Sequence, residues 1–237
     1  MKHIPYFMDS QMIGLPEQLC VLSRAGCRAV LGVFPFITSK EQTMTAKAAQ
    51  GTIQLSEPAS YQDVLDAPPH KVAEVIAGTL HLSPRPASRH ARARTGLVAR
   101  IGLPYSYGDG GPGGWWIIGE PELHLGEDIL VPELAGWRRE RMPDYPDAAY
   151  FALAPDCICE VLSPSTRALD QGKKRAIYAR EGVVHLWFID PDARILEAFE
   201  LRDGQWVLLE TLTDNDPVSL SPFDATSFSL GDLWSDS

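Results

Sequence analysis

Residues 159–194, CEVLSPSTRALDQGKKRAIYAREGVVHLWFIDPDAR, contain the strongest fold signal in the chain, a strand, a helix and a second strand. The first strand, PDCICEVLS, ends at Pro164, and either Ser165 or Thr166 can cap the helix that follows. The helix closes at Gly182, a residue type that favours the left-handed C-terminal position. The second strand, VVHLWFID, is continuously apolar, which is typical of strands buried on both faces. This unit predicts a mixed α/β domain.

The segments before this unit predict a short helix and a hairpin. Ser60, with Asp63 three residues later, is a capping pattern that predicts a helix start. The stretch KVAEVIAGTLHLS, residues 71–83, consists of two β-rich runs joined at Ala77 and Gly78, and it predicts a β-hairpin.

Residues 89–102, RHARARTGLVARIG, predict a helix capped by Ser88. Apolar and small residues recur in it at helical spacing, so we expect this face to pack and the arginines to face outward. The packed face is expected to contain Ala91, Thr95, Val98 and Ile101.

Strand patterns also lie on both sides of the central unit. WWIIGEPELHL (115–125) and DILVPELAGW (128–137) are typical of successive strands. RILEAFEL and QWVLLETL are two alternating strands around the turn at residues 202–204. The sequence therefore predicts one mixed α+β domain over residues 44–237, with a β meander at its C-terminal end.

The first 43 residues lack a sustained period and are expected to be an N-terminal extension to this domain. Translation starting at Met44 and a genuine extension are both compatible with the sequence. No apolar run reaches the ~18 residues of a membrane span, and no signal peptide is evident. The four cysteines do not form the pattern of a disulfide scaffold. We therefore expect a cytoplasmic protein.

The chain of 237 residues carries 31 acidic and 21 basic side chains, a formal net charge of −10. Taken alone, this charge argues against a polyanionic ligand, because binding a duplex depends on neutralising phosphates. From residue 190 onward, however, 11 acidic residues stand against two arginines, a net −9, which leaves −1 for residues 1–189. The segment RPASRHARAR (85–94) has four arginines and no acidic residue. We therefore expect weak, metal-assisted binding of nucleic acid, with the C-terminal meander facing away from it.

Residues 128–190 contain the side chains that phosphodiester hydrolysis requires. Glu133 is expected at the end of a strand, Glu160 lies inside the next long strand, and Lys173 and Lys174 fall on the following helix. Carboxylates hold Mg²⁺, the ion acidifies a bound water, and a lysine can orient or deprotonate that water. By spacing alone, solvated charges remain the simpler explanation. Glu160 is the exception, since a carboxylate in an apolar strand is costly unless paired, although strand alternation could still turn it to solvent.

The stretch 159–194 resembles the signature of the Uma-type restriction endonucleases, a bacterial family of the PD-(D/E)XK nuclease superfamily. The segments EVIAGTLHLSPRPASRH (74–90) and GEDILVPELAGWRRERMP (126–143) match the family in the same order. The resemblance covers residues 60–234. It implies a restriction endonuclease-like central mixed sheet flanked by helices, with the C-terminal meander as an addition.

The resemblance also implies a metal-dependent catalytic site. Glu160 matches the metal-binding acid of the central strand, and Glu133 matches the earlier acidic position, where the usual residue is Asp. The lysine usually found two residues after the strand acid is absent, since Leu162 stands there, and Lys174 on the following helix matches it instead. Glu74 matches the N-terminal acidic residue, which would complete a site for Mg²⁺ or Mn²⁺. Lys174 would position the attacking water.

Other residues are candidates to support this site or to contact the substrate. Asp170 either holds Lys174, four residues further along the helix, or caps that helix. His90 matches a recurring histidine of the family, either as a buried hydrogen-bonding residue or as a substrate contact. Glu74 has the alternative of a solvated hairpin carboxylate. Trp137 is the one tryptophan expected to stack on a base. Non-specific contacts with the DNA backbone are expected from Arg89, Arg92, Arg94, Arg138, Arg139 and Arg141.

Two functions remain open on the sequence. The first is a metal-dependent endonuclease that hydrolyses phosphodiester bonds of DNA. The second is a catalytically decayed nuclease fold that binds DNA or a protein partner. The Glu at position 133 and the missing strand lysine favour the second modestly, whereas the joint presence of Glu160, Asp170 and Lys174 favours the enzyme. No membrane partner is expected, and the sequence does not determine whether the chain forms a homodimer.

Overall fold

The structure is a computed structural model, and it describes residues 57–85 and 87–234. All of them belong to one compact unit of the chain, Gln54–Ser237. The predicted extension over residues 1–43 and the candidate start at Met44 lie outside the described residues.

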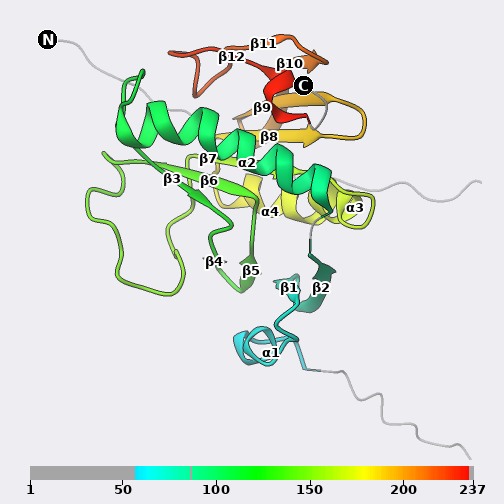
Figure 1. Cartoon of the computed structure of the whole chain (residues 1–237). Helices are drawn as coiled ribbons and strands as arrows, with labels where there is room; N and C mark the ends of the chain where they lie inside the picture. Colours follow the sequence, from blue (N-terminus) through cyan, green and yellow to red (C-terminus); the bar gives the residue numbers. More distant parts are fainter. Residues whose placement is uncertain (1–56, 86, 235–237) are drawn as a thin grey trace, which may run out of the picture. The chain divides into compact units, whose positions relative to one another are not determined.

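A six-stranded sheet forms the centre of the unit, with strand order β10-β9-β8-β7-β6-β3 (Figure 1). Strands β7 and β8 run parallel, and the other neighbours are antiparallel. The strands are β3 (Trp115–Gly119), β6 (Leu134–Arg138), β7 (Cys157–Val161), β8 (His185–Asp190), β9 (Ile195–Arg202) and β10 (Gln205–Thr213). Because β8, β9 and β10 pair consecutively, the predicted meander is confirmed.

A second, four-stranded sheet has the order β2-β1-β5-β4. Two short strands near the C-terminus also pair with each other. The bounds are β1 (Lys71–Ile76), β2 (Thr79–Pro84), β4 (Leu123–Leu125), β5 (Asp128–Leu130), β11 (Pro217–Val218) and β12 (Phe228–Ser229). The predicted mixed α+β fold with a central mixed sheet is therefore confirmed.

The helical segments are α1 (Tyr61–Leu65), α2 (Ser88–Gly102), α3 (Arg167–Leu169), α4 (Arg175–Arg180), the π-helical η1 (Leu103–Tyr107) and η2 (Asp170–Lys174), and the 3₁₀ turn η3 (Leu230–Leu233). Within the described part of the chain, none of these helices has the length and apolar character needed to cross a membrane.

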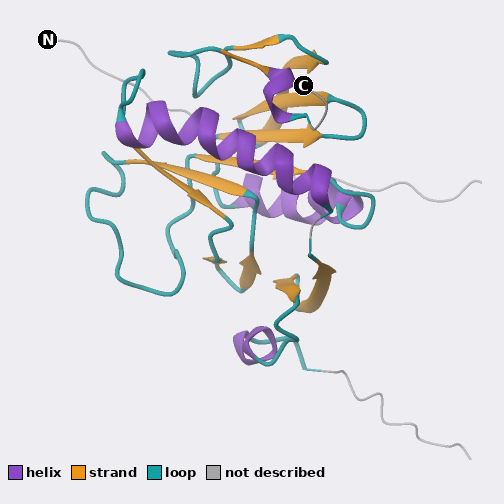
Figure 2. Cartoon of the chain, in the orientation of Figure 1, coloured by secondary structure: helices purple, strands orange, loops and turns teal. Residues whose placement is uncertain are grey.

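Helices cover both faces of the larger sheet (Figure 2). On β7, Cys157, Cys159 and Val161 pack in the core that includes α2, whereas Ile158 packs in the core that includes α4. Successive side chains of a strand point to opposite faces, and both faces are covered here, which explains why the whole of β7 is buried. Glu160 consequently points to the same side as Ile158, toward the segment that carries Lys174.

Local signals in the sequence agree with the structure at several turns. Ser60 and Asp63 form the predicted capping box at the start of α1. Ala77 and Gly78 join β1 to β2 with φ of 51° and 72°, so the hairpin has the two left-handed residues that a tight two-residue turn requires. The prediction of this hairpin is confirmed.

The predicted packing face of α2 is partly wrong: Ile101 is buried and Val98 packs against the core as predicted, but the centre of the face is shifted by about one residue. Ser88 is the first residue of the helix, and Ala87 occupies the N-cap position. The buried apolar residues are Ala93, Leu97 and Ile101, whereas Thr95 is exposed. The small residues of α2 allow either of two adjacent faces of the helix to be buried. The face with Leu97 packs in the core because leucine buries more apolar surface than threonine.

This correction predicts different costs for two neighbouring truncations. Leu97→Ala is expected to lower the free energy of unfolding by about 2–5 kcal/mol, because it empties space in a fully buried position. The matched control Thr95→Ala is expected to change it by less than about 0.5 kcal/mol, since Thr95 is exposed. Chemical denaturation monitored by circular dichroism measures both values, and equal costs would contradict the assignment of the face.

Candidate active site

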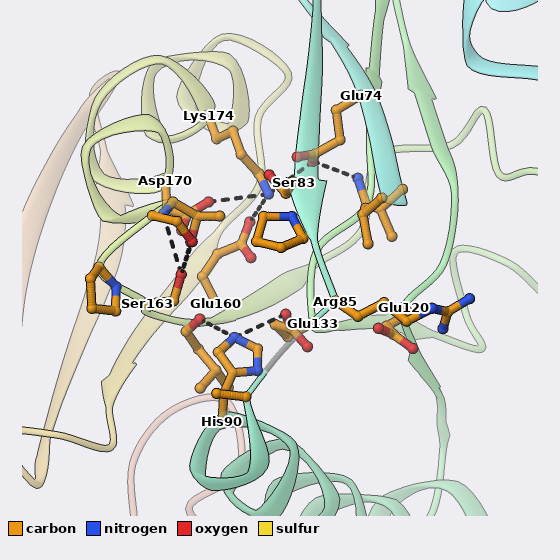
Figure 3. A pocket seen from close by; sticks show the side chains of 18 residues that line it. Glu74, Ser83, Arg85, His90, Glu120, Glu133, Glu160, Ser163, Asp170 and Lys174 are labelled. Atoms are coloured by element: carbon orange, nitrogen blue, oxygen red, sulfur yellow. Dashed lines mark hydrogen bonds and ion pairs between the residues drawn. The ribbon is translucent and has the colours of Figure 1, made fainter. Parts of the chain in front are cut away.

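A cavity of about 270 Å³ lies where the two sheets and the helical segment after β7 meet (Figure 3). Its walls come from β1 and β2, from the connection between β5 and β6, from β7, and from η2. The acidic and basic residues that line it are Glu74, Arg85, Glu120, Glu133, Glu160, Asp170 and Lys174, together with His90. Residues distant in the sequence are thus brought to one place.

Lys174 is the centre of a buried charge cluster. Its Nζ lies 3.0 Å from Glu74 Oε1, 2.8 Å from Glu160 Oε1 and 3.3 Å from Asp170 Oδ1. All four side chains are at most 5% exposed. Burial opposes the charged form of Lys174, but the carboxylates of Glu160 and Glu74 outweigh it and raise its pKa well above the usual value. Lys174 is therefore a protonated cation in this site.

Glu160 is held at the end of β7 by two donors that meet the same oxygen. Lys174 Nζ and the hydroxyl of Tyr178, which donates over 2.6 Å, both contact Oε1. Burial raises the pKa of Glu160 to about 7, although the charge of Lys174 opposes this shift. The position of Glu160 in the strand is thus compensated by hydrogen bonds, as a buried carboxylate requires.

A π-helical turn carries two residues of the charge cluster, Asp170 and Lys174. The predicted helix after Pro164 is divided into α3, η2 and α4, and η2 spans Asp170–Lys174. Asp170 and Lys174 are buried at its two ends, while Lys173 is exposed. Turns of this kind are rare and occur frequently at functional sites.

Glu133 lies in the connection immediately before β6, not at the end of a strand as expected. Leu134 pairs with Cys159, so Glu133 comes next to Glu160 across the antiparallel pair β6–β7. Burial raises the pKa of Glu133 to about 8, and the nearby charge of Glu160 acts in the same direction. The carboxylates of Glu133, just before β6, and of Glu160, on β7, therefore line the cavity together.

The two oxygens of Glu133 have different surroundings. Oε1 lies 3.2 Å from His90 Nε2. Oε2 is buried and has no hydrogen-bond partner among the described residues, and Arg94 Nε lies 3.9 Å from it. A buried acceptor without a donor is rare in folded proteins, and this oxygen is therefore a suitable ligand for a water or a cation.

His90 contacts both β7 and the residue that precedes β6. Its Nε2 lies 2.7 Å from the carbonyl oxygen of Val161, and since a carbonyl only accepts, Nε2 carries the proton and donates. Burial lowers the pKa of His90, so the ring is neutral. The same N–H is within reach of Glu133 Oε1. Of the two roles left open for His90, the structure shows the buried hydrogen-bonding one.

Comparison with known proteins bears on this geometry. A family profile described as "Putative restriction endonuclease", Uma2, matches residues 58–231. The chain belongs to the Uma2 family. The resemblance deduced from the sequence is therefore confirmed.

A solved structure has a fold similar to that of this chain. It is described as "a putative nuclease belonging to DUF820" from Anabaena variabilis, with a TM-score of 0.60 and 21% identity. The alignment covers 74% of this chain and 97% of that one. At this identity the likeness establishes the fold. The search of curated proteins gave no match.

In this Uma2 protein, most predicted site residues meet at the cavity. Glu74, Glu133, Glu160, Lys174, His90 and Asp170 all line it. Asp170 is an ion-pair partner of Lys174, which agrees with the first of its two predicted roles. Glu74 is buried, so the alternative of a solvated hairpin carboxylate is wrong. Its Oε1 also accepts the N–H of Val131 over 2.9 Å.

Among the arginines predicted to contact DNA, the structure distinguishes two groups. Arg89 is 69% exposed and lines a second cavity, of about 200 Å³, that shares His90, Ser163 and Pro164 with the first. Arg138 lies at the end of β6 away from Glu133 and packs over the Trp115 ring, 4.6 Å from its centroid.

The second group therefore lies away from the cavity. Arg138 is roughly 13 Å along β6 from the cavity end of the strand at ~3.3 Å per residue. Arg139 packs over the ring of Trp116, and Arg141 pairs with Asp156 over 2.8 Å. Trp137 is fully buried, and its Nε1 donates to the carbonyl of Leu153, so the prediction that it stacks on bases is wrong.

Two residues of the site were missed or assigned differently from the sequence. Arg94 was expected to face DNA, but it forms an ion pair with Glu120. Glu120 was not predicted at all, although it lines the cavity. The available signal was local: Glu120 stands between Gly119 and Pro121, a combination typical of a turn at the end of a strand.

Proposed function

We propose that this chain is a metal-dependent endonuclease that hydrolyses phosphodiester bonds of DNA and uses Mg²⁺ or Mn²⁺. The observation that carries the proposal is the buried, unpartnered Oε2 of Glu133 next to Glu160, in a cavity that also holds a buried lysine. Membership of the Uma2 family, described as "Putative restriction endonuclease", supports the substrate class.

The acidic residues fit a cation bound by two carboxylates. Within the described residues, no three His, Cys, Asp or Glu side chains converge in a way that could hold a metal. Mg²⁺ commonly takes one or two protein carboxylates and fills its other positions with waters and substrate phosphate oxygens. Glu133 and Glu160 would hold the ion in this arrangement. Glu74 as a third ligand stays a prediction, since its Oε1 is engaged by Lys174 and Val131.

When bound, the metal would acidify a water and neutralise charge that develops on the phosphate. Lys174 is protonated and held by three carboxylates, so it would orient the attacking water or a phosphate oxygen through its N–H groups rather than remove a proton. His90 and Tyr178 would keep Glu133 and Glu160 in fixed orientations. Arg89 would contact the DNA backbone at the neighbouring cavity.

The test is incubation of plasmid and single-stranded DNA with the full chain in Mg²⁺ or Mn²⁺, followed by chelator. We expect cleavage that stops on chelation and that is lost in Glu160→Gln. Glu210→Gln is the matched control, since Glu210 is an exposed carboxylate on β10, and it should cleave like the wild type.

Cleavage that ignores chelator, or that persists in Glu160→Gln, would contradict the proposed mechanism. DNA binding without cleavage in any metal would instead support the alternative, a nuclease fold that only binds.

A further inference from the structure

Two carboxylates lie within ion-pair distance of the Arg94 guanidinium. Arg94, on α2, forms an ion pair through Nη1 with Oε2 of Glu120. Arg94 Nε is 3.9 Å from Glu133 Oε2, which is beyond hydrogen-bond distance. Arg94 therefore pairs more closely with Glu120 than with Glu133. Despite these ion pairs, Arg94 Nη1 and Glu133 Oε2 are both buried without a hydrogen-bond partner among the described residues.

The backbone places Glu120 for this contact at an energetic cost. Glu120 has φ of 49°, in the left-handed region that residues with a Cβ seldom adopt. It follows the last residue of β3, and its N–H donates to the carbonyl of Glu133 over 3.2 Å. The strand pair β3–β6 thus holds the backbones of Glu120 and Glu133 together, and the carboxylates of both residues lie within ion-pair distance of Arg94.

Without the Glu120 carboxylate, Glu133 would become the nearest anion to Arg94. The two side chains are only 24% and 17% exposed, so their attraction would be weakly screened. A short movement would let the guanidinium donate to Oε2, the oxygen that the proposed cation needs. Arginine and a divalent cation would then compete for one carboxylate.

We propose that Glu120 is a positioning residue that holds Arg94 away from Glu133 and so keeps Glu133 Oε2 available to a divalent cation. This inference rests on the proposed function, because it takes Glu133 as a metal ligand. Glu120 acts through its ion pair with Arg94 and is not itself a ligand of the metal.

The test is titration of Mn²⁺ into the metal-free full chain, followed by calorimetry. We expect Glu120→Gln to weaken Mn²⁺ binding by about 10-fold or more, in the range seen when partners of metal ligands are removed. Arg94→Met should bind Mn²⁺ at least as tightly as the wild type. The double variant Glu120→Gln/Arg94→Met should return to within about threefold of Arg94→Met, because the competing guanidinium is gone.

Two further variants control for folding. Glu120→Gly removes the carboxylate and relieves the left-handed backbone, so it should fold at least as well as the wild type and still show the weakened binding. Glu122→Gln breaks a different carboxylate contact on the same connection, that of Glu122 with His124, and should leave Mn²⁺ binding unchanged. Thermal unfolding of each variant reports its folded state.

The outcomes separate the two proposals. Unchanged Mn²⁺ affinity in both Glu120→Gln and Glu120→Gly overturns this inference alone. Weakened affinity that the double variant does not restore also overturns it, because Glu120 then acts as a ligand or as a structural support. A wild type that binds no Mn²⁺, or whose binding is unaffected by Glu133→Ala, overturns the proposed function and this inference with it.

Discussion

Replacing Lys174 with Met is expected to reduce metal-dependent DNA cleavage at least about 100-fold, as loss of one electrostatic donor at a reacting phosphate does. It should also lower the free energy of unfolding by about 3–5 kcal/mol at neutral pH, the typical cost of removing one partner of a buried ion pair. The reason is that Glu74, Glu160 and Asp170 would remain buried together without the cation that they share.

Lys173→Met is the matched control for this variant. Lys173 is the preceding residue, carries the same charge and is exposed, so both cleavage and stability should stay close to wild type. Lys174→Arg separates charge from geometry: it retains the cation, but a planar guanidinium cannot replace a compact ammonium among three carboxylates. Single-turnover cleavage and urea unfolding measure the two effects. Cleavage by Lys174→Met within about threefold of wild type would contradict the role given to this lysine.

Mn²⁺ affinity is expected to rise steeply with pH between about 6 and 8. Burial raises the pKa of Glu133 to about 8 and that of Glu160 to about 7, so both carboxyls must lose protons in this range to bind a cation. Each proton released on binding makes the affinity change about tenfold per pH unit. Calorimetry in buffers of different ionisation enthalpy measures both the affinity and the number of protons released.

The stability of the metal-free chain should change in the opposite direction. A carboxyl whose pKa is raised in the folded state binds more protons there than in the unfolded chain, so its contribution to stability is lost as the pH rises toward 8. Glu133→Gln cannot ionise and should lose less stability over this range than the wild type. Thermal unfolding in chelator at pH 5–9 tests this, and parallel curves for the two proteins would contradict the raised pKa of Glu133.

Much of the fold followed from short-range patterns. The hairpin at Ala77 and Gly78 was predictable because turn geometry depends on adjacent residues. Glu160 could be singled out because a carboxylate flanked by apolar strand residues has few stable environments other than a paired one. The packing face of α2 was less certain from sequence, since small residues allow two stripes and only the neighbouring core selects between them.

Some residues of the candidate site were predicted and others were not, because contacts between distant elements also decide which side chains reach the cavity. Family resemblance pointed to Glu74, Glu133, Glu160 and Lys174, and the structure brings all four to one cavity. Arg138 was expected to contact DNA together with five other arginines. It lies at the end of β6, whereas Glu133 immediately precedes the first residue of that strand. Glu120 had no predicted partner because Arg94 meets it from another element.

Sequence patterns alone were sufficient for the strand–helix–strand unit of residues 159–194 and for the buried acid within it, because strand alternation, helix caps and turns depend on nearby residues. They could not show which oxygen of Glu133 is left without a donor, or that Lys174 is shared by three carboxylates. Those properties arise where β1, β6, β7, α2 and η2 meet, since burial and charge act over a few ångströms in space regardless of separation along the chain.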